Sequence, residues 1–163
     1  MHKKFKMLFL LGITCALAAC SSFPEIKQFP TTNEQAKHMY KVQQQEPKQQ
    51  TSLLVIQSGA DQWRWILTDP LGAPLARMLL TPQGWKADGF APPNEQAKYL
   101  FAAITTYLDP SLSLLNYSEI KDDQGWKNYF VDNRLVWKIQ VKQNQAQIIL
   151  FDNSQWLVTY LPQ

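Results

Sequence analysis

Few residues in this sequence are of the types that carry out acid–base, nucleophilic or metal chemistry. The 163-residue chain has two histidines and two cysteines. His2 and Cys15 fall within residues 1–19, which are typical of a secretory signal. His38 then remains without any Gly-x-Ser-x-Gly turn, so no nucleophilic triad is predicted. Cys20 alone cannot form a disulfide framework or a Cys/His metal cluster.

The carboxylates and glycines also suggest no chemistry. Asp122 and Asp123 precede Gln124-Gly125 and are predicted to be solvated loop residues. Four others stand beside proline or asparagine, where turn formation explains them: Asp69, Asp109, Asp132 and Asp152. The six glycines are scattered, so no phosphate-binding loop is predicted. We predict no catalysis, cofactor or metal, although a glycosidase-like carboxylate pair from distant strands stays open.

The end of the signal carries a motif with a defined chemistry. The apolar run Met7–Ala19 is shorter than the roughly 20 residues of a membrane-spanning helix. Leu17-Ala18-Ala19-Cys20 matches the lipobox of bacterial lipoproteins, in which the cysteine becomes the first mature residue and carries diacylglycerol. The alternative is a plain secretory signal that ends near a cysteine. Ser21, rather than aspartate, at the second mature position favours an outer-membrane location facing the periplasm.

Removal of the signal changes the net charge. The chain has 16 basic and 13 acidic residues, a formal net charge of +3. Lys3, Lys4 and Lys6 leave with the signal and no acidic residue does, so the mature chain is neutral. A neutral domain without a basic run lacks the electrostatic footprint of a nucleic-acid-binding protein, so we predict no nucleic-acid partner.

The mature chain is predicted to be a tether, residues 20–32, followed by one domain, residues 33–163. The domain is expected to contain a short helix over Asn33–Gln45 and a stronger helix from Asn94 to Leu108. The stronger helix should end at Asp109-Pro110, because the residue before proline avoids helical angles. The same five residues, Asn-Glu-Gln-Ala-Lys, stand at 33–37 and 94–98, which predicts two similar helix starts.

Alternating apolar residues predict strands on both sides of the stronger helix. They cover about 53–57, 63–68, 75–80 and 85–88 before it, and 126–131, 134–142, 145–151 and 156–161 after it. Asp-Asn and Gln-Asn turns separate the last four strands, as in an antiparallel meander. We therefore predict a mainly β domain with some α (α+β), a curved antiparallel sheet of seven or more strands with one or two helices covering its apolar face.

Tryptophans on these strand faces suggest a binding cavity. All six tryptophans lie in the mature domain. Core packing explains any single one of them, but as a set they could line a concave sheet that holds an acyl chain. The candidate lining residues are Trp63, Trp65, Leu67, Leu100, Ile104, Leu135, Trp137 and Ile139.

The loop Asp69-Pro70-Leu71-Gly72 joins two predicted strands and carries a leucine where a simple turn would be polar. Either Leu71 folds back onto the domain, or it is an exposed apolar residue that touches lipid or cargo. Pro70, Leu71 and Gly72 are therefore candidate contacts with a membrane or a cargo.

The lipobox, the strand Trp63–Thr68, the loop Pro70-Leu71-Gly72 and the strand after it resemble the LolB family. The stretches Asp69–Arg77, Gly84–Phe90 and Pro92-Pro93-Asn94 more closely resemble a lipoprotein family of the LolA/LolB-like superfamily, whose members often accompany aryl polyene biosynthesis genes. The resemblance implies an open half-barrel with helices as a lid over an apolar cavity, and an apolar loop residue, here Leu71, that helps transfer cargo.

These observations lead to two functional hypotheses. The first is a non-enzymatic outer-membrane lipoprotein that binds or transfers an acyl, lipoprotein or polyene-lipid group. Its expected partners are the membrane, through lipidated Cys20, an acylated cargo and a periplasmic carrier protein that could deliver it. The second is a structural lipoprotein that docks onto an envelope or biosynthetic complex.

Overall fold

The computed structural model describes residues 22–30, 35–89 and 93–162, which form ten strands and one helix. The first five strands are β1 (Ala36–Glu46), β2 (Gln50–Ser58), β3 (Trp63–Thr68), β4 (Pro74–Thr81) and β5 (Gly84–Ala87). Helix α2 (Glu95–Leu108) follows. The last five strands are β6 (Glu119–Asp123), β7 (Trp126–Val131), β8 (Arg134–Lys142), β9 (Gln145–Leu150) and β10 (Gln155–Leu161). The prediction of a mainly β domain is confirmed.

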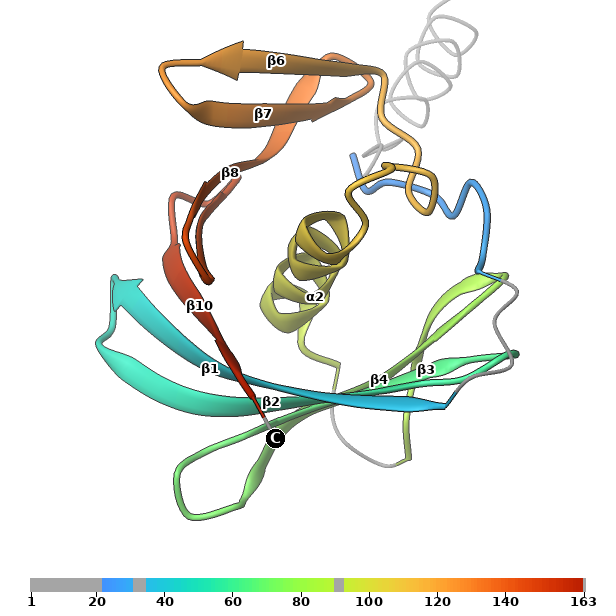
Figure 1. Ribbon diagram of the computed structural model, residues 1–163, viewed down its shortest axis with the longest axis vertical. Coiled ribbons are helices and arrows are strands. Elements are labelled where there is room, and N and C mark those ends of the chain that lie inside the picture. The colour runs from blue at the N-terminus through green and yellow to red at the C-terminus, as the bar shows by residue number, and fades with distance from the viewer. Residues whose placement is uncertain (1–21, 31–34, 90–92, 163) are drawn as a thin grey trace, which may run out of the picture.

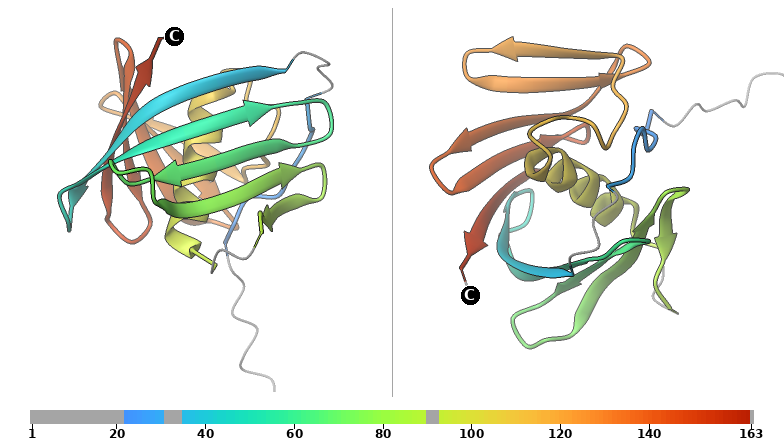
Figure 2. Two further views of the ribbon diagram at one scale, coloured as in Figure 1. Left: turned by 90° about the horizontal axis from the view of Figure 1, so that it is seen from below. Right: turned by 45° about the vertical axis from the view of Figure 1, so that its right-hand side comes forward.

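All ten strands belong to one antiparallel sheet in the order β5-β4-β3-β2-β1-β10-β9-β8-β7-β6. The pairing of β1 with β10 in the middle of the sheet joins the first and last parts of the domain. Strands β5 and β6 are the two edges and do not pair with each other, so the sheet is curved but open. Figures 1 and 2 show the sheet bending around α2, which lies on its concave side.

Residues alternate between the two faces of the sheet, as the strand geometry requires. In β2, Leu54 and Ile56 are buried on the concave side, whereas the flanking Leu53 and Gln57 are exposed. The apolar residues predicted from this alternation therefore do form the core.

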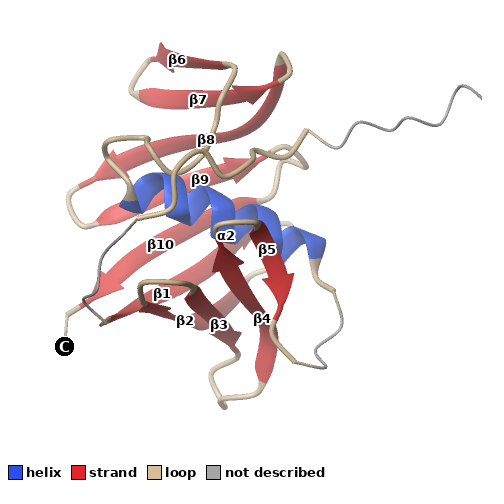
Figure 3. Ribbon diagram, turned by 90° about the vertical axis from the view of Figure 1, so that its right-hand side faces the viewer, coloured by secondary structure: helices blue, strands red, loops and turns tan. Residues whose placement is uncertain are grey.

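Helix α2 begins and ends as its sequence predicts. The Asn94 side chain accepts a hydrogen bond from the Ala97 N–H at 3.0 Å, which caps the first turn. The Asp109 N–H donates to the Thr105 carbonyl at 3.0 Å, just before Pro110 stops the helix. The middle of the helix is completely buried, over Leu100, Phe101, Ala102, Ala103 and Ile104. Figure 3, which looks into the open side of the sheet, shows loops crossing in front of it.

The helix predicted over Asn33–Gln45 is wrong, because Ala36–Glu46 is strand β1. Its cap, Asn33, lies outside the described residues. Tyr40, Val42 and Gln44 are buried at a period of two, which is a strand pattern. Strands β2 and β10 pair with β1 on its two sides, and this pairing satisfies its backbone groups.

The predicted tether is shorter than expected, because residues 22–30 pack on the domain. We call these residues the N-terminal strap. Phe23 packs edge-on against Tyr99 of α2, with ring centroids 5.0 Å apart. Phe29 packs against Trp63 at 6.0 Å. The two prolines of the strap therefore belong to a packed segment rather than to a free linker.

The predicted meander is confirmed in strands β7 to β10, but the sequence did not predict β6. Asp122 and Asp123, predicted to be loop residues, are the last two residues of β6 and pair with Lys127 and Trp126 of β7. All five residues of β6 are exposed, so the alternation that reveals buried strands is absent. Its charged residues suit an edge strand, where they discourage pairing with other chains.

A β-bulge also moves one candidate cavity residue to the other face. Trp137 pairs with Tyr129, but Leu135 pairs with Phe130, so the register shifts by one residue between them. Directly opposed residues share a face of the sheet. Leu135 is therefore on the opposite face from Trp137, not beside it as predicted, and it is half-buried.

Candidate functional site

The centre of the concave side is filled by side chains. Six of the eight predicted cavity residues are buried there, namely Trp65, Leu67, Leu100, Ile104, Trp137 and Ile139, and Trp63 is half-buried. The Trp65 ring lies 5.3 Å from Phe101 of α2 and 5.4 Å from Trp85, centroid to centroid. These residues therefore form the packing between sheet and helix. Pockets lie towards the two ends of α2.

An apolar pocket of about 410 Å³ lies between the C-terminal end of α2 and strands β7 and β8. We call it the distal pocket. Its lining residues are Thr106, Tyr107, Asp109, Pro110, Leu112, Gly125, Lys127, Tyr129, Ile139 and Val141. Ile139 was among the predicted cavity residues. Val141 is 54% exposed although Ile139 and its strand partner Ala146 are buried, so this part of the pocket wall is accessible. The volume falls in the usual range of small-ligand sites.

Charged groups stand at one side of the distal pocket. Lys127 of β7 lies directly across from Asp122 of β6 and, on its other side, from Ile139 of β8. Burial raises the pKa of the Tyr129 hydroxyl, and the nearby Asp122 carboxylate raises it further. An ammonium and a carboxylate thus accompany an apolar wall, an arrangement that suits the polar head of an amphiphile.

Asp109 also lines the distal pocket, but its role is structural. Partial burial raises its pKa, whereas hydrogen bonds from the Ser111 hydroxyl and the Leu114 N–H lower it, and the net pKa is below the ordinary value. The ionised carboxylate therefore orders residues 109–114, the chain that leaves α2 and closes one side of the pocket. The side-chain hydrogen bonds of Asp109 are made to residues 111–114, so we assign the carboxylate a structural role.

A smaller pocket of about 150 Å³ lies at the other end of α2. Leu67 and Leu100, two more of the predicted cavity residues, line it together with Leu75 and Trp156. Gln44 and Ser52 give it a polar side. Its volume is below the roughly 300–1,000 Å³ of typical ligand sites, so we do not expect it to hold a complete acyl chain.

The loop between β3 and β4 presents Leu71 to solvent. The Leu71 side chain is 94% exposed, so it does not fold back onto the domain. One carboxylate oxygen of Asp69 accepts hydrogen bonds from the Leu71 N–H at 2.9 Å and the Ala73 N–H at 2.8 Å. Gly72 has φ +90°, which a residue with a side chain adopts only with strain. The loop is therefore held in one shape while it exposes a leucine.

Two further pockets flank Trp85 and Lys98 beside the N-terminal strap. One, of about 370 Å³, lies between Phe23–Ile26 of the strap and the β4–β5 turn; the other, of about 220 Å³, lies towards the start of α2. The indole N–H groups of Trp63, Trp65 and Trp85 are buried without an acceptor among the described residues. Of these three indoles, Trp85 is the one that lines both pockets.

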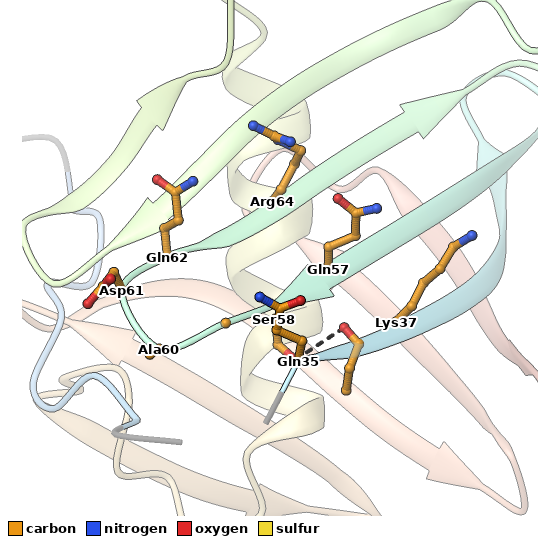
Figure 4. Close-up of a pocket in the computed structure, with 10 residues that line it drawn as sticks. Gln35, Lys37, Gln57, Ser58, Ala60, Asp61, Gln62 and Arg64 are labelled. Atoms are coloured by element: carbon orange, nitrogen blue, oxygen red, sulfur yellow. Dashed lines mark hydrogen bonds between the residues drawn. The ribbon is translucent and has the colours of Figure 1, made fainter. Parts of the chain in front are cut away.

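The opposite, convex face carries a polar depression of about 680 Å³ at the end of β1, β2 and β3. Lys37, Gln57 and Arg64 stand on the face of the sheet turned away from α2, and Asp61 and Gln62 lie in the turn beside them (Figure 4). Arg64 and Arg77 share the Asp88 carboxylate, each at 3.1 Å. Three glutamines, Gln35, Gln57 and Gln62, contribute much of its polar lining, and its lining residues include no catalytic pair.

Two candidates from the sequence remain. Cys20 lies outside the described residues. His38 is near Tyr160, with ring centroids 6.5 Å apart. Tyr40 lies two residues further along β1. Burial, together with the nearby Tyr107 and Tyr160, raises the pKa of its hydroxyl to about 12.

Across residues 22–30, 35–89 and 93–162, no three His, Cys, Asp or Glu side chains could hold a metal ion. In the same residues no helix is long and apolar enough to cross a membrane.

The bulge at Leu135 and the strand β6 were not predictable from periodicity. Asp122 of β6, Gly125 of the β6–β7 turn and Lys127 of β7 nevertheless lie in or beside the distal pocket. The Gln124-Gly125 pair was the available sequence signal for β6, because both residues adopt positive φ in the tight turn between β6 and β7.

The chain matches no protein-family model, and none of the curated proteins matches it.

Proposed function

We propose that this chain is a non-enzymatic lipoprotein of the outer membrane, facing the periplasm, which binds the acyl part of a lipid or acylated cargo. The lipobox ending at Cys20 supports the membrane anchor. The open, curved sheet around one helix supports a half-barrel of LolA/LolB type. The exposed Leu71 supports an apolar contact that either a membrane or a cargo makes.

The distal pocket is the observation that carries the binding proposal. Besides Thr106, Asp109 and Lys127, its lining is aliphatic and tyrosine side chains, and Val141 in its wall is exposed, so an acyl chain would replace water on apolar surface. Burial of such surface is worth about 25 cal/mol per Å². Lys127 lines the pocket and Asp122 lies across from it on β6, so the two supply charges that suit a polar head group.

A titration with a fluorescent fatty acid tests this proposal. The protein is a Cys20→Ser variant, which lacks the acyl chains that would compete for the pocket. We expect saturable binding, and Val141→Asp should weaken it at least tenfold, about 1.4 kcal/mol, because a carboxylate then stands in the apolar wall. Leu53→Asp is the matched control, since Leu53 is a 36%-exposed strand residue on the convex face. Equal binding by both variants would remove the distal pocket as the site.

Docking onto a protein complex is the second candidate, and the filled centre of the concave side favours it. A module that only docks needs a packed core and no ligand space. Native mass spectrometry of the Cys20→Ser variant separates the two functions. A co-purifying lipid mass supports binding, whereas a ligand-free mass together with no fatty-acid binding is the result expected of a docking lipoprotein.

A further inference from the structure

The N-terminal strap places the proposed lipid anchor close to one side of the domain. Three residues lead from Cys20 to Phe23, and each advances the chain by at most about 3.6 Å, so Cys20 lies within about 11 Å of Phe23. Phe23 is fixed on the domain by the Tyr99 ring, and the Lys98 ammonium lies 4.5 Å from its ring centroid. The membrane that holds the anchor must therefore be near the start of the strap.

The start of the strap lies beside the β4–β5 turn. Phe23–Ile26 share the 370 Å³ pocket with Pro82, Gln83 and Gly84 of that turn. The loop that carries Leu71 is at the other end of β4. This strand has eight residues, and at about 3.3 Å per residue it separates the two ends by about 26 Å. Figures 1 and 3 show the same relation: residues 22–30 begin in the upper part of the molecule, and the β3–β4 loop forms its lower end.

The form of the loop indicates the kind of contact it makes. Its tip is apolar over Pro70, Leu71, Ala73 and Pro74, and the two prolines have fixed φ angles. The Asp69 carboxylate is turned inward, where it accepts two backbone hydrogen bonds. One leucine contributes about 1.5–3 kcal/mol when fully buried, which is too little to hold a domain on a bilayer. A preformed knob of this size suits a matching pocket on another protein, because little ordering is needed on binding.

We infer that the Leu71 loop points away from the anchoring membrane and inserts its leucine into an apolar pocket of a soluble protein partner. The inference rests on the lipid anchor of the proposed function. It excludes the anchoring membrane as the contact of the exposed leucine and assigns that contact to a protein, a protein cargo included. The lipid bilayer contacts the β4–β5 side of the domain, and the partner approaches the β3–β4 side.

Single-cysteine labelling of the lipidated chain in vesicles tests the orientation. Cys15 is removed with the signal and the Cys20 thiol is consumed by lipidation, so a fluorophore on Leu71→Cys or Gln83→Cys is unique. Both positions are exposed and stand at opposite ends of β4. With an energy acceptor on the lipid headgroups of phosphatidylethanolamine–phosphatidylglycerol vesicles, we expect strong transfer from position 83 and weak transfer from position 71.

Equal transfer from the two positions, or stronger transfer from position 71, would overturn the inference and leave the anchor intact. A chain that does not float with the vesicles would instead overturn the anchor itself, and the inference with it. The partner is tested with a photo-crosslinking amino acid at position 71 or 83 of the lipidated protein in cells. A protein adduct at 71 and not at 83 is expected. A lipid adduct at 71, or the absence of a protein adduct there, would overturn the partner assignment.

Discussion

Ile26 and Leu115 face each other in an antiparallel bridge that joins the N-terminal strap to the chain after α2. Two backbone hydrogen bonds flank the pair, from the Lys27 N–H to the Leu114 carbonyl at 2.8 Å and from the Asn116 N–H to the Glu25 carbonyl at 3.0 Å. The strap thereby covers the side of α2 that the sheet leaves open. The segment next to the proposed anchor is thus part of the fold.

Removal of the Phe29 ring should destabilise the domain. Phe29 is half-buried against Trp63, so Phe29→Ala should lower the free energy of unfolding by about 1.5–2.5 kcal/mol, half the cost for a fully buried phenylalanine. Urea denaturation measures the change. Leu71→Ala is the control and should stay within about 0.5 kcal/mol of the parent, because Leu71 touches little. An unchanged stability of Phe29→Ala would contradict the packing of the strap.

Replacement of Asp69 should loosen the Leu71 loop without affecting the core. Asp69→Ala removes the acceptor of the Leu71 and Ala73 N–H groups, so the exchange of these two amide hydrogens should accelerate at least tenfold, while amides of β1 exchange as before. Hydrogen–deuterium exchange followed by NMR measures both. Asp69→Asn keeps an acceptor oxygen and should retain part of the protection. Equal exchange in all three proteins would show that the carboxylate does not order the loop.

Acid should destabilise the domain partly through Asp109. Its pKa in the folded state lies below the ordinary value, since hydrogen bonds outweigh the effect of burial. Such a group stabilises the fold above its unfolded pKa, and this contribution is lost as the pH falls towards the folded pKa. Asp109→Asn should therefore lose less stability than the parent between pH 6 and pH 3, by under about 1 kcal/mol because the group is mostly solvated. Urea midpoints across this range measure the difference, and parallel curves would contradict the prediction.

Alkaline pH should destabilise the domain through its buried tyrosines. Burial raises the pKa of Tyr40 to about 12 and also raises that of Tyr117. The unfolded chain ionises these groups near pH 10, so the folded state is favoured below that pH and the advantage is lost as the pH rises towards the folded pKa values. Tyrosinate absorbance should show two classes of tyrosine. One class ionises near pH 10 and the other at higher pH. Tyr40→Phe should remove one tyrosine from the class that ionises at higher pH. If it removes one from the class that ionises near pH 10 instead, the fold does not raise the pKa of Tyr40.

Local sequence signals predicted the elements whose structure depends on near neighbours. The Asn94 cap and Pro110 stop bound α2, because both act on backbone groups within one turn. The turns of the meander contain Asp132, Asn133 and Asn153, each with positive φ. These are short-range effects, so one sequence suffices to identify them.

The repeated pentapeptide shows where local signals end. Asn-Glu-Gln-Ala-Lys caps and begins α2 at residues 94–98, but at the other copy Ala36 and Lys37 already belong to strand β1. The difference arises from the residues that come after each copy and from the strands that lie beside it. Tyr40 and Val42 bury their side chains at a period of two, and β2 and β10 pair with both edges of the strand. Such pairing outweighs a modest helix preference.

The sequence alone determined a match to the lipobox pattern at Cys20, a β-rich domain and an apolar loop at Leu71, because these depend on residue type and short spacing. The distal pocket needed the folded chain. It combines Leu112, Lys127 and Ile139 from three segments, and the Leu135 bulge decides which side chains of β8 face it. The orientation of Leu71 relative to the proposed anchor likewise depends on the strap packing across α2, a long-range contact made of half-buried aromatic rings that no local pattern encodes.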